Sequence, residues 1–100
     1  MYWVLLEAEA EEDLRLLQEL YSTTSVGLAQ RFTKAIAANF STLETFPLAF
    51  PTVNEISGLP IRRVLIRGFP KALLYMVIED LSEVRILRCY DTRGADFKLR

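Results

Sequence analysis

The side chains in this sequence that are able to do chemistry are mainly arginines and tyrosines. The 100 residues include no histidine and a single cysteine, Cys89. This composition excludes a Ser-His-Asp or Cys-His nucleophile pair, a disulfide framework and a zinc site with the usual ligands. Arginine beside tyrosine can stabilise a phosphorane-like transition state and position a ribose hydroxyl, so metal-free RNA cleavage is chemically feasible. The alternatives are plain surface arginines, or a cationic sheet face that docks a protein or nucleic acid.

No cofactor or metal motif is visible in the sequence. It contains no P-loop, dinucleotide fingerprint, HExxH or CxxC, and its acidic residues lack a recognisable metal-binding spacing. We therefore expect neither a cofactor nor a metal. Cys89 lies within an apolar run, where a lone cysteine is most often a small core residue.

Positive charge is concentrated in the second half of the chain. Residues 1–50 have three basic and seven acidic side chains, whereas residues 51–100 have nine basic and six acidic ones. This polarity can steer an anionic partner to one face, although an ordinary solvated surface is the alternative. The net charge of −1 argues against strong non-specific binding of nucleic acid.

A three-stranded meander is the central element that these basic residues occupy. Three apolar runs, Ile61–Arg67, Lys71–Glu79 and Glu83–Tyr90, are separated by gaps of only a few residues. Such gaps join antiparallel neighbours and are too short for helical crossovers. Strict alternation puts one set of side chains on the same side of the last strand, namely Val84, Ile86, Arg88 and Tyr90. The meander and the residues just after it hold seven basic side chains: Arg62, Arg63, Arg67, Lys71, Arg85, Arg88 and Arg93.

The remaining elements must cover one face of this sheet. Met1–Leu6 is a short apolar strand, placed at the edge of the meander, and Glu9–Tyr21 and Val26–Thr45 are amphipathic helices. Pro47–Pro60, with three prolines and a glycine, indicates a loop or a single irregular turn. The order β-α-α-β-β-β predicts an α+β fold, with a helical hairpin on one face of an antiparallel sheet. We expect one domain over residues 1–100.

Three details of these elements have alternative interpretations. Ser25 or Thr24 can cap the second helix. Trp3 is either a core residue, which is favoured, or an exposed docking aromatic. The first helix has a broad apolar stripe made by Leu14, Leu16, Leu17, Leu20 and Tyr21. The spare part of this stripe either forms a groove for a partner or is consumed by the sheet and the second helix.

A cytoplasmic location is expected. The first acidic residue, Glu7, follows only six residues, so no signal peptide or membrane span is predicted. Half of the residues are hydrophobic (51%), which argues against disorder.

Four segments in a fixed order resemble a known family. They are Ala8–Leu17 (AEAEEDLRLL), Leu43–Pro47 (LETFP), Arg62–Val77 (RRVLIRGFPKALLYMV) and Glu83–Arg93 (EVRILRCYDTR). Over nearly the whole chain this order resembles the RelE/ParE family of bacterial toxins from type II toxin–antitoxin pairs. The resemblance implies a toxin of a plasmid-stabilisation or stress module. It also implies a cognate antitoxin that neutralises the toxin in a hetero-oligomer.

The family has two branches that differ in mechanism. RelE-like members cut mRNA on the ribosome with basic residues of the sheet, whereas ParE-like members lack that set and poison DNA gyrase. Here Phe69-Pro70 resembles the ParE branch, Leu65 and Ala72 occupy positions where the nuclease branch tends to be basic, and Tyr90-Asp91 stands where many relatives have histidine. A ParE-like gyrase inhibitor is therefore favoured. The alternatives are a ribosome-dependent mRNA endonuclease and a diverged, inactive interaction domain.

The resemblance also assigns candidate site residues to each role. If the chain is a nuclease, the catalytic candidates are Arg63, Arg88, Tyr90 and Arg93. Antitoxin binding is expected at Leu16, Leu20, Tyr21 and Trp3. Contacts with the target are expected at Arg62, Arg67 and Asp91.

Overall fold

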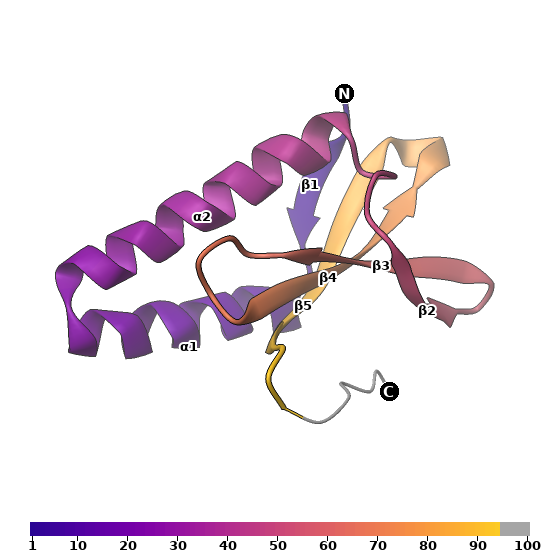
Figure 1. Cartoon of the computed structure of the whole chain (residues 1–100). Coiled ribbons are helices and arrows are strands. Elements are labelled where there is room, and N and C mark those ends of the chain that lie inside the picture. Colours follow the sequence, from indigo (N-terminus) through magenta and orange to yellow (C-terminus); the bar gives the residue numbers. More distant parts are fainter. Residues whose placement is uncertain (95–100) are drawn as a thin grey trace.

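The computed structural model describes residues 1–94 and shows a helical hairpin beside a twisted sheet (Figure 1). A short 3₁₀ helix, Glu79–Leu81, joins the last two strands. The expected α+β class and the arrangement of a helical hairpin on a sheet are confirmed. The main elements are β1 (Trp3–Leu6), α1 (Ala8–Thr24), α2 (Val26–Thr45), β2 (Thr52–Ile56), β3 (Leu59–Leu65), β4 (Lys71–Ile78) and β5 (Glu83–Asp91).

The sheet has the strand order β1-β5-β4-β3-β2. The predicted meander is present, since β3, β4 and β5 pair antiparallel in sequence. As expected, β1 lies at an edge, but it runs parallel to β5, with Val4 opposite Val84. The sheet is therefore mixed rather than wholly antiparallel. Because two helices separate β1 from the meander, no hairpin turn forces β1 into an antiparallel direction.

The expected loop between the second helix and the meander contains an additional strand. Thr52–Ile56 forms β2 and pairs with β3 through a tight turn at Ser57 and Gly58. Both turn residues have positive φ (51° and 82°), which suits a two-residue hairpin turn. All five residues of β2 are exposed, so the strand has no buried face to produce an apolar alternation. This is the physical reason why the sequence did not reveal it.

The two helices meet at Ser25, which ends α1 and begins α2. Its hydroxyl oxygen accepts a hydrogen bond from the Leu28 backbone N–H at 3.0 Å, which confirms Ser25 as the cap of the second helix. The Ser25 N–H donates to the Tyr21 carbonyl, so α1 continues to Thr24 instead of stopping at Tyr21.

The core lies between the hairpin and the sheet. Phe32 and Leu43 of α2 and Tyr75 of β4 are each no more than 1% exposed. The rings of Tyr21, Phe32 and Phe69 form a cluster with centroids 5.0–5.3 Å apart. This cluster joins both helices to the turn between β3 and β4.

Two predictions about burial have opposite outcomes. Cys89 is 6% exposed and belongs to the core, as predicted. Trp3 is 73% exposed, so the favoured core placement was wrong. Its neighbours Tyr2 and Val4 pack against the core. Because successive side chains of a strand alternate, Trp3 projects from the opposite face.

Within the described part of the chain, none of the helices is both long and apolar enough to cross a membrane.

Candidate functional site

Three of the candidate catalytic residues share the face of the sheet that is turned away from the core. Arg63 lies opposite Leu74, and Leu74 lies opposite Arg88, so the two arginines belong to one cross-strand row. Tyr90 is in the adjacent row, opposite Ala72. The Arg63 guanidinium Nη1 donates to the Tyr90 hydroxyl at 3.4 Å.

A β-bulge in β5 creates this grouping. The register shifts so that Leu74 pairs with Arg88 while Tyr75 pairs with Ile86, which leaves Leu87 as the additional residue. Val84 and Ile86 therefore stay in the core, whereas Arg88 and Tyr90 turn to the other face. The expectation that these four side chains share one side was wrong, since the bulge reverses the alternation after Ile86.

Arg88 is held against the first helix. Its Nε donates to Asp13 Oδ2 at 2.7 Å and its Nη2 donates to Asp13 Oδ1 at 3.1 Å, and Glu9 lies 3.5 Å from its Nη1. The hydrogen bond to Asp13 raises the pKa of Arg88. Asp13 also accepts the Cys89 backbone N–H at 3.0 Å. Because β1 reaches only to Ile86, Asp13 caps the edge of β5 beyond the end of β1.

Asp13 is the residue of this site that the sequence did not reveal. The acidic side chains at the start of α1 are usually explained by the helix dipole. However, Asp13 stands three residues after buried Ala10 and four before Leu17, so it lies on the apolar stripe. A carboxylate on such a stripe predicts a basic partner on the element beneath it.

Arg93 folds back on Asp91 at the end of β5. Its Nη2 donates to Asp91 Oδ2 at 2.7 Å, and its backbone N–H donates to Oδ1 at 2.8 Å. Lys71, which is 8% exposed, donates to the same carboxylate at 2.7 Å. Arg93 first, and Lys71 next, hold the pKa of Asp91 well below its usual range. Asp91 thus neutralises two cations of its own chain.

The three residues expected to contact the target lie at three different places. Arg62 is on the core side of the sheet, opposite Tyr75, and its Nη1 donates to the Phe50 carbonyl at 2.6 Å. Arg67 is exposed in the turn between β3 and β4. Asp91 lies in the ion pairs described above. The structure does not bring these three together.

The candidate antitoxin residues divide between two surfaces. Leu16 and Leu20 lie one turn apart on α1 and are 50% and 59% exposed. Tyr21 packs against the core through Phe32. Trp3 lies on β1, whereas Leu20 lies in the second half of α1, about 18 Å of helix rise from the first residue of that helix. The sheet and the second helix therefore do not consume the whole apolar stripe.

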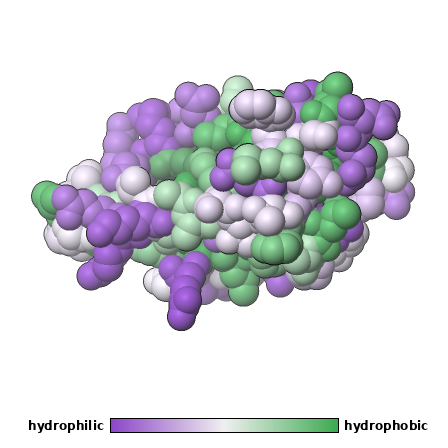
Figure 2. Space-filling model, turned by 90° about the horizontal axis from the view of Figure 1, so that it is seen from above, coloured by the Kyte–Doolittle hydropathy of each residue, from purple (hydrophilic) through white to green (hydrophobic). Residues whose placement is uncertain are grey.

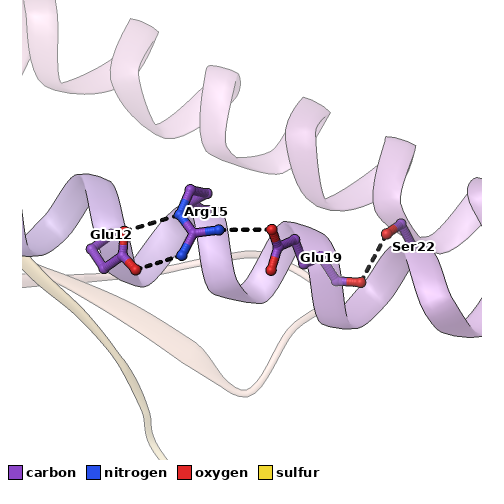
Figure 3. A network of polar contacts seen from close by, with 4 residues as sticks. All are labelled: Glu12, Arg15, Glu19 and Ser22. Atoms are coloured by element: carbon purple, nitrogen blue, oxygen red, sulfur yellow. Dashed lines mark hydrogen bonds and ion pairs between the residues drawn. The ribbon is translucent and has the colours of Figure 1, made fainter.

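A shallow pocket of about 240 Å³ extends from this part of α1 to the end of β5. It is lined by Leu16, Leu17, Cys89 and Tyr90, together with the charged residues Asp13, Lys71 and Asp91. On the neighbouring surface of the helix, Arg15 bridges Glu12 and Glu19, as Figure 3 shows. The exposed leucines are thus bordered by charged groups of both signs. Hydrophobic and hydrophilic patches also alternate where the molecule is seen from above (Figure 2).

The chemistry available in this arrangement is limited. Arg63 with Tyr90 can hold a phosphate and donate a proton, but no histidine is present as a general base. Burial raises the pKa of the Cys89 thiol to about 12, so it is protonated at neutral pH and is a poor nucleophile. Residues 1–94 bring together no group of three metal-binding side chains.

Comparison with known proteins gives a family match over almost the whole chain. Residues 4–94 match the family described as ParE toxin of type II toxin-antitoxin system, parDE. No curated protein matches the sequence.

Solved toxin–antitoxin structures have the same fold. A chain of the chromosomal ParDE system from P. aeruginosa is 19% identical with a TM-score of 0.71, over 93% of this chain and 98% of that one. The isolated E. coli RelE toxin is 14% identical with a TM-score of 0.62, over 96% and 89%. A chain of the RelBE2 complex from Mycobacterium tuberculosis is 26% identical with a TM-score of 0.58, over 95% and 93%.

Proposed function

Because the chain belongs to the ParE toxin family of type II toxin–antitoxin systems, we propose that it arrests growth by inhibiting DNA gyrase and that a cognate antitoxin neutralises it. Gyrase inhibition requires binding alone, so it needs neither a metal nor a general base on the toxin. The expected cytoplasmic location is part of the same proposal, since both gyrase and the antitoxin act there.

One observation supports gyrase over RNA as the target: two of the three candidate nuclease arginines are engaged by carboxylates of their own chain. Arg88 is held by Asp13 and Arg93 by Asp91. A catalytic arginine must face the phosphate whose charge it stabilises in the transition state. In the row of Tyr90, the cross-strand neighbours are Ala72 and Leu65, which add no positive charge.

The contact between Arg63 and Tyr90 favours a second candidate function, ribosome-dependent cleavage of mRNA. In that mechanism Arg63 would bind the scissile phosphate and Tyr90 would act as the proton donor. RNA binding would also have to draw Arg88 away from Asp13. Breaking this half-buried ion pair makes the nuclease the less favoured candidate.

The exposed leucines of α1 support an antitoxin-binding surface. Leu16 and Leu20 are spaced by one helical turn, and Leu16 also lines the pocket beside β5. An amphipathic helix that lays its apolar face on this strip would cover both leucines. At the border of the strip that helix would meet Glu12 and Glu19, which Arg15 already bridges. We assign Tyr21 to the base of this surface and Trp3 to a separate contact.

The first experiment is a supercoiling assay with purified gyrase and relaxed plasmid. We expect the chain to inhibit supercoiling in a dose-dependent manner, and the antitoxin to restore it. Arg67→Ala should weaken inhibition if the exposed turn between β3 and β4 touches gyrase. The matched control is Arg31→Ala, which removes an exposed arginine from α2. Normal supercoiling at toxin concentrations that arrest growth would overturn the proposal.

The second experiment measures mRNA cleavage in a reconstituted translation mixture. The gyrase proposal predicts intact mRNA. The nuclease alternative predicts cuts in the ribosomal decoding site, and these cuts should be lost in Arg63→Ala and Tyr90→Phe but kept in Arg31→Ala. Codon-specific cuts that depend on Tyr90 would replace gyrase with the ribosome as the target.

A further inference from the structure

A second hollow lies on the core-facing side of the sheet, at the end that α2 does not cover. It has a volume of about 490 Å³, which is within the range of pockets that hold small ligands or anchoring side chains. Its lining comes from the segment after α2, from β3 and β4, and from the 3₁₀ helix. In Figure 1 these elements meet on the side of the molecule away from the turn between α1 and α2. None of its lining residues belongs to α1.

The walls of this hollow are apolar and accessible. Leu48 and Leu59 are 54% and 41% exposed, and Val77 and Ile78 of β4 are half-buried. Arg62 also lines the hollow, but its guanidinium donates to the Phe50 and Leu48 carbonyls at 2.6 and 3.3 Å. Arg62 thus fixes the segment that forms one wall.

The rim of the hollow carries two carboxylates, and Arg62, the basic residue in its lining, binds the carbonyls of the wall rather than these carboxylates. Within residues 1–94, the Glu79 carboxylate accepts hydrogen bonds from the neutral Tyr2 hydroxyl, at 3.2 and 3.3 Å, and Asp80 is exposed. Among residues 1–94, neither Glu79 nor Asp80 has a salt bridge, unlike Glu83 nearby, which pairs with Arg85. An apolar hollow with two carboxylates that form no salt bridge within residues 1–94 complements an aliphatic or aromatic side chain next to Lys or Arg.

We propose that this hollow is a second docking site for the antitoxin, at which an apolar side chain enters between Leu48 and Ile78 while an adjacent basic residue pairs with Glu79 and Asp80. This inference rests on the proposed antitoxin partnership and adds to it. The strip on α1 and this hollow lie on different elements, so one antitoxin chain engages both only by wrapping around the toxin. Two linked contacts raise the overall affinity well above that of either contact alone.

The experiment titrates the full-length protein encoded beside this gene into the purified chain and measures affinity by calorimetry. Asp80→Lys and Leu48→Ser change exposed side chains and should preserve the fold, which their melting curves will verify. We expect each to weaken binding by about tenfold. The matched control is Glu55→Lys, which reverses an exposed charge on β2 outside the hollow and should leave the affinity unchanged.

Salt and self-association complete the design. At 0.5 M NaCl, screening should reduce the difference in antitoxin affinity between Asp80→Lys and wild type. The difference in affinity between Leu48→Ser and wild type should stay the same, because it depends on an apolar contact. If the antitoxin binds the wild type, Asp80→Lys and Leu48→Ser equally, the hollow is not a docking site, although the antitoxin partnership stands. If the wild type does not bind the antitoxin, the docking site and the antitoxin partnership both fail. A wild-type dimer that Asp80→Lys dissociates would make a second copy the occupant and overturn the assignment.

Discussion

The two sides of α1 differ in what their polar and apolar groups contact. On the side facing the sheet, Asp13 binds Arg88 and the Cys89 backbone, and its side chain is 17% exposed. On the solvent side, Arg15 bridges Glu12 and Glu19 with more than half of each side chain exposed. The leucines divide in the same way, because Leu14 and Leu17 pack on the core while Leu16 and Leu20 are exposed. One helix therefore combines a side that stabilises the fold with a side that is available to a partner.

The largest expected effect comes from the residue of α2 against which the inner side of α1 packs. Phe32 is 1% exposed and touches the rings of Tyr21 and Phe69. Phe32→Ala leaves a cavity in this cluster and should lower the free energy of unfolding by about 3–5 kcal/mol. For a domain of this size the melting temperature should fall by more than about 12 °C. A smaller fall than that of Leu20→Ala would contradict the assignment of the core.

Removal of Asp13 should have the next largest effect. Asp13→Ala leaves the Arg88 guanidinium and the Cys89 N–H without this carboxylate, which should cost about 2 kcal/mol in chemical denaturation. Arg15→Ala is the control on the solvent side, and its exposed ion pairs should contribute less than about 1 kcal/mol. Equal losses of unfolding free energy in the two variants would mean that the ion pair of Asp13 stabilises the fold no more than the exposed ion pairs of Arg15.

Asp91, at the end of β5, should make the stability of the fold depend on pH. Its pKa in the folded state is depressed by Arg93 and Lys71. A depressed carboxyl pKa contributes stability that is present above the unfolded value of about 3.9 and is lost as the pH falls below it. Asp91→Asn should therefore melt below wild type at pH 7, and the difference should narrow below about pH 4. A difference in melting temperature between Asp91→Asn and wild type that stays constant over this pH range would contradict this role. A similar pH-dependent difference in the exposed control Asp80→Asn would also contradict it.

The smallest effect on stability is expected on the solvent side. Leu16→Ala and Leu20→Ala remove side chains that are already about half exposed, so each should change the unfolding free energy by less than about 1 kcal/mol. If this side is the antitoxin surface, the same changes should weaken antitoxin binding by tenfold or more. Losses of stability that account for the losses of binding would instead assign both leucines to the core.

Much of this molecule could be predicted from its sequence, because local patterns dictate it. The apolar repeats of the two helices, the Ser25 cap and the three runs of the meander each depend on residues close in the chain. The burial of Cys89 followed from its apolar neighbours. The motifs from Ala8 to Arg93 also sufficed to indicate the family, which the match over residues 4–94 confirms.

The tertiary structure decided how these elements meet. The bulge at Leu87, which turns Arg88 and Tyr90 to the open face, depends on pairing with β4 and has no local signature. The exposed β2 has no buried face, and the parallel direction of β1 is set by a partner more than 75 residues away in sequence. Whether an arginine is available to a target depends on which carboxylate the fold places beside it. Asp13 reaches Arg88 across 75 residues, so only the folded chain reveals that pair.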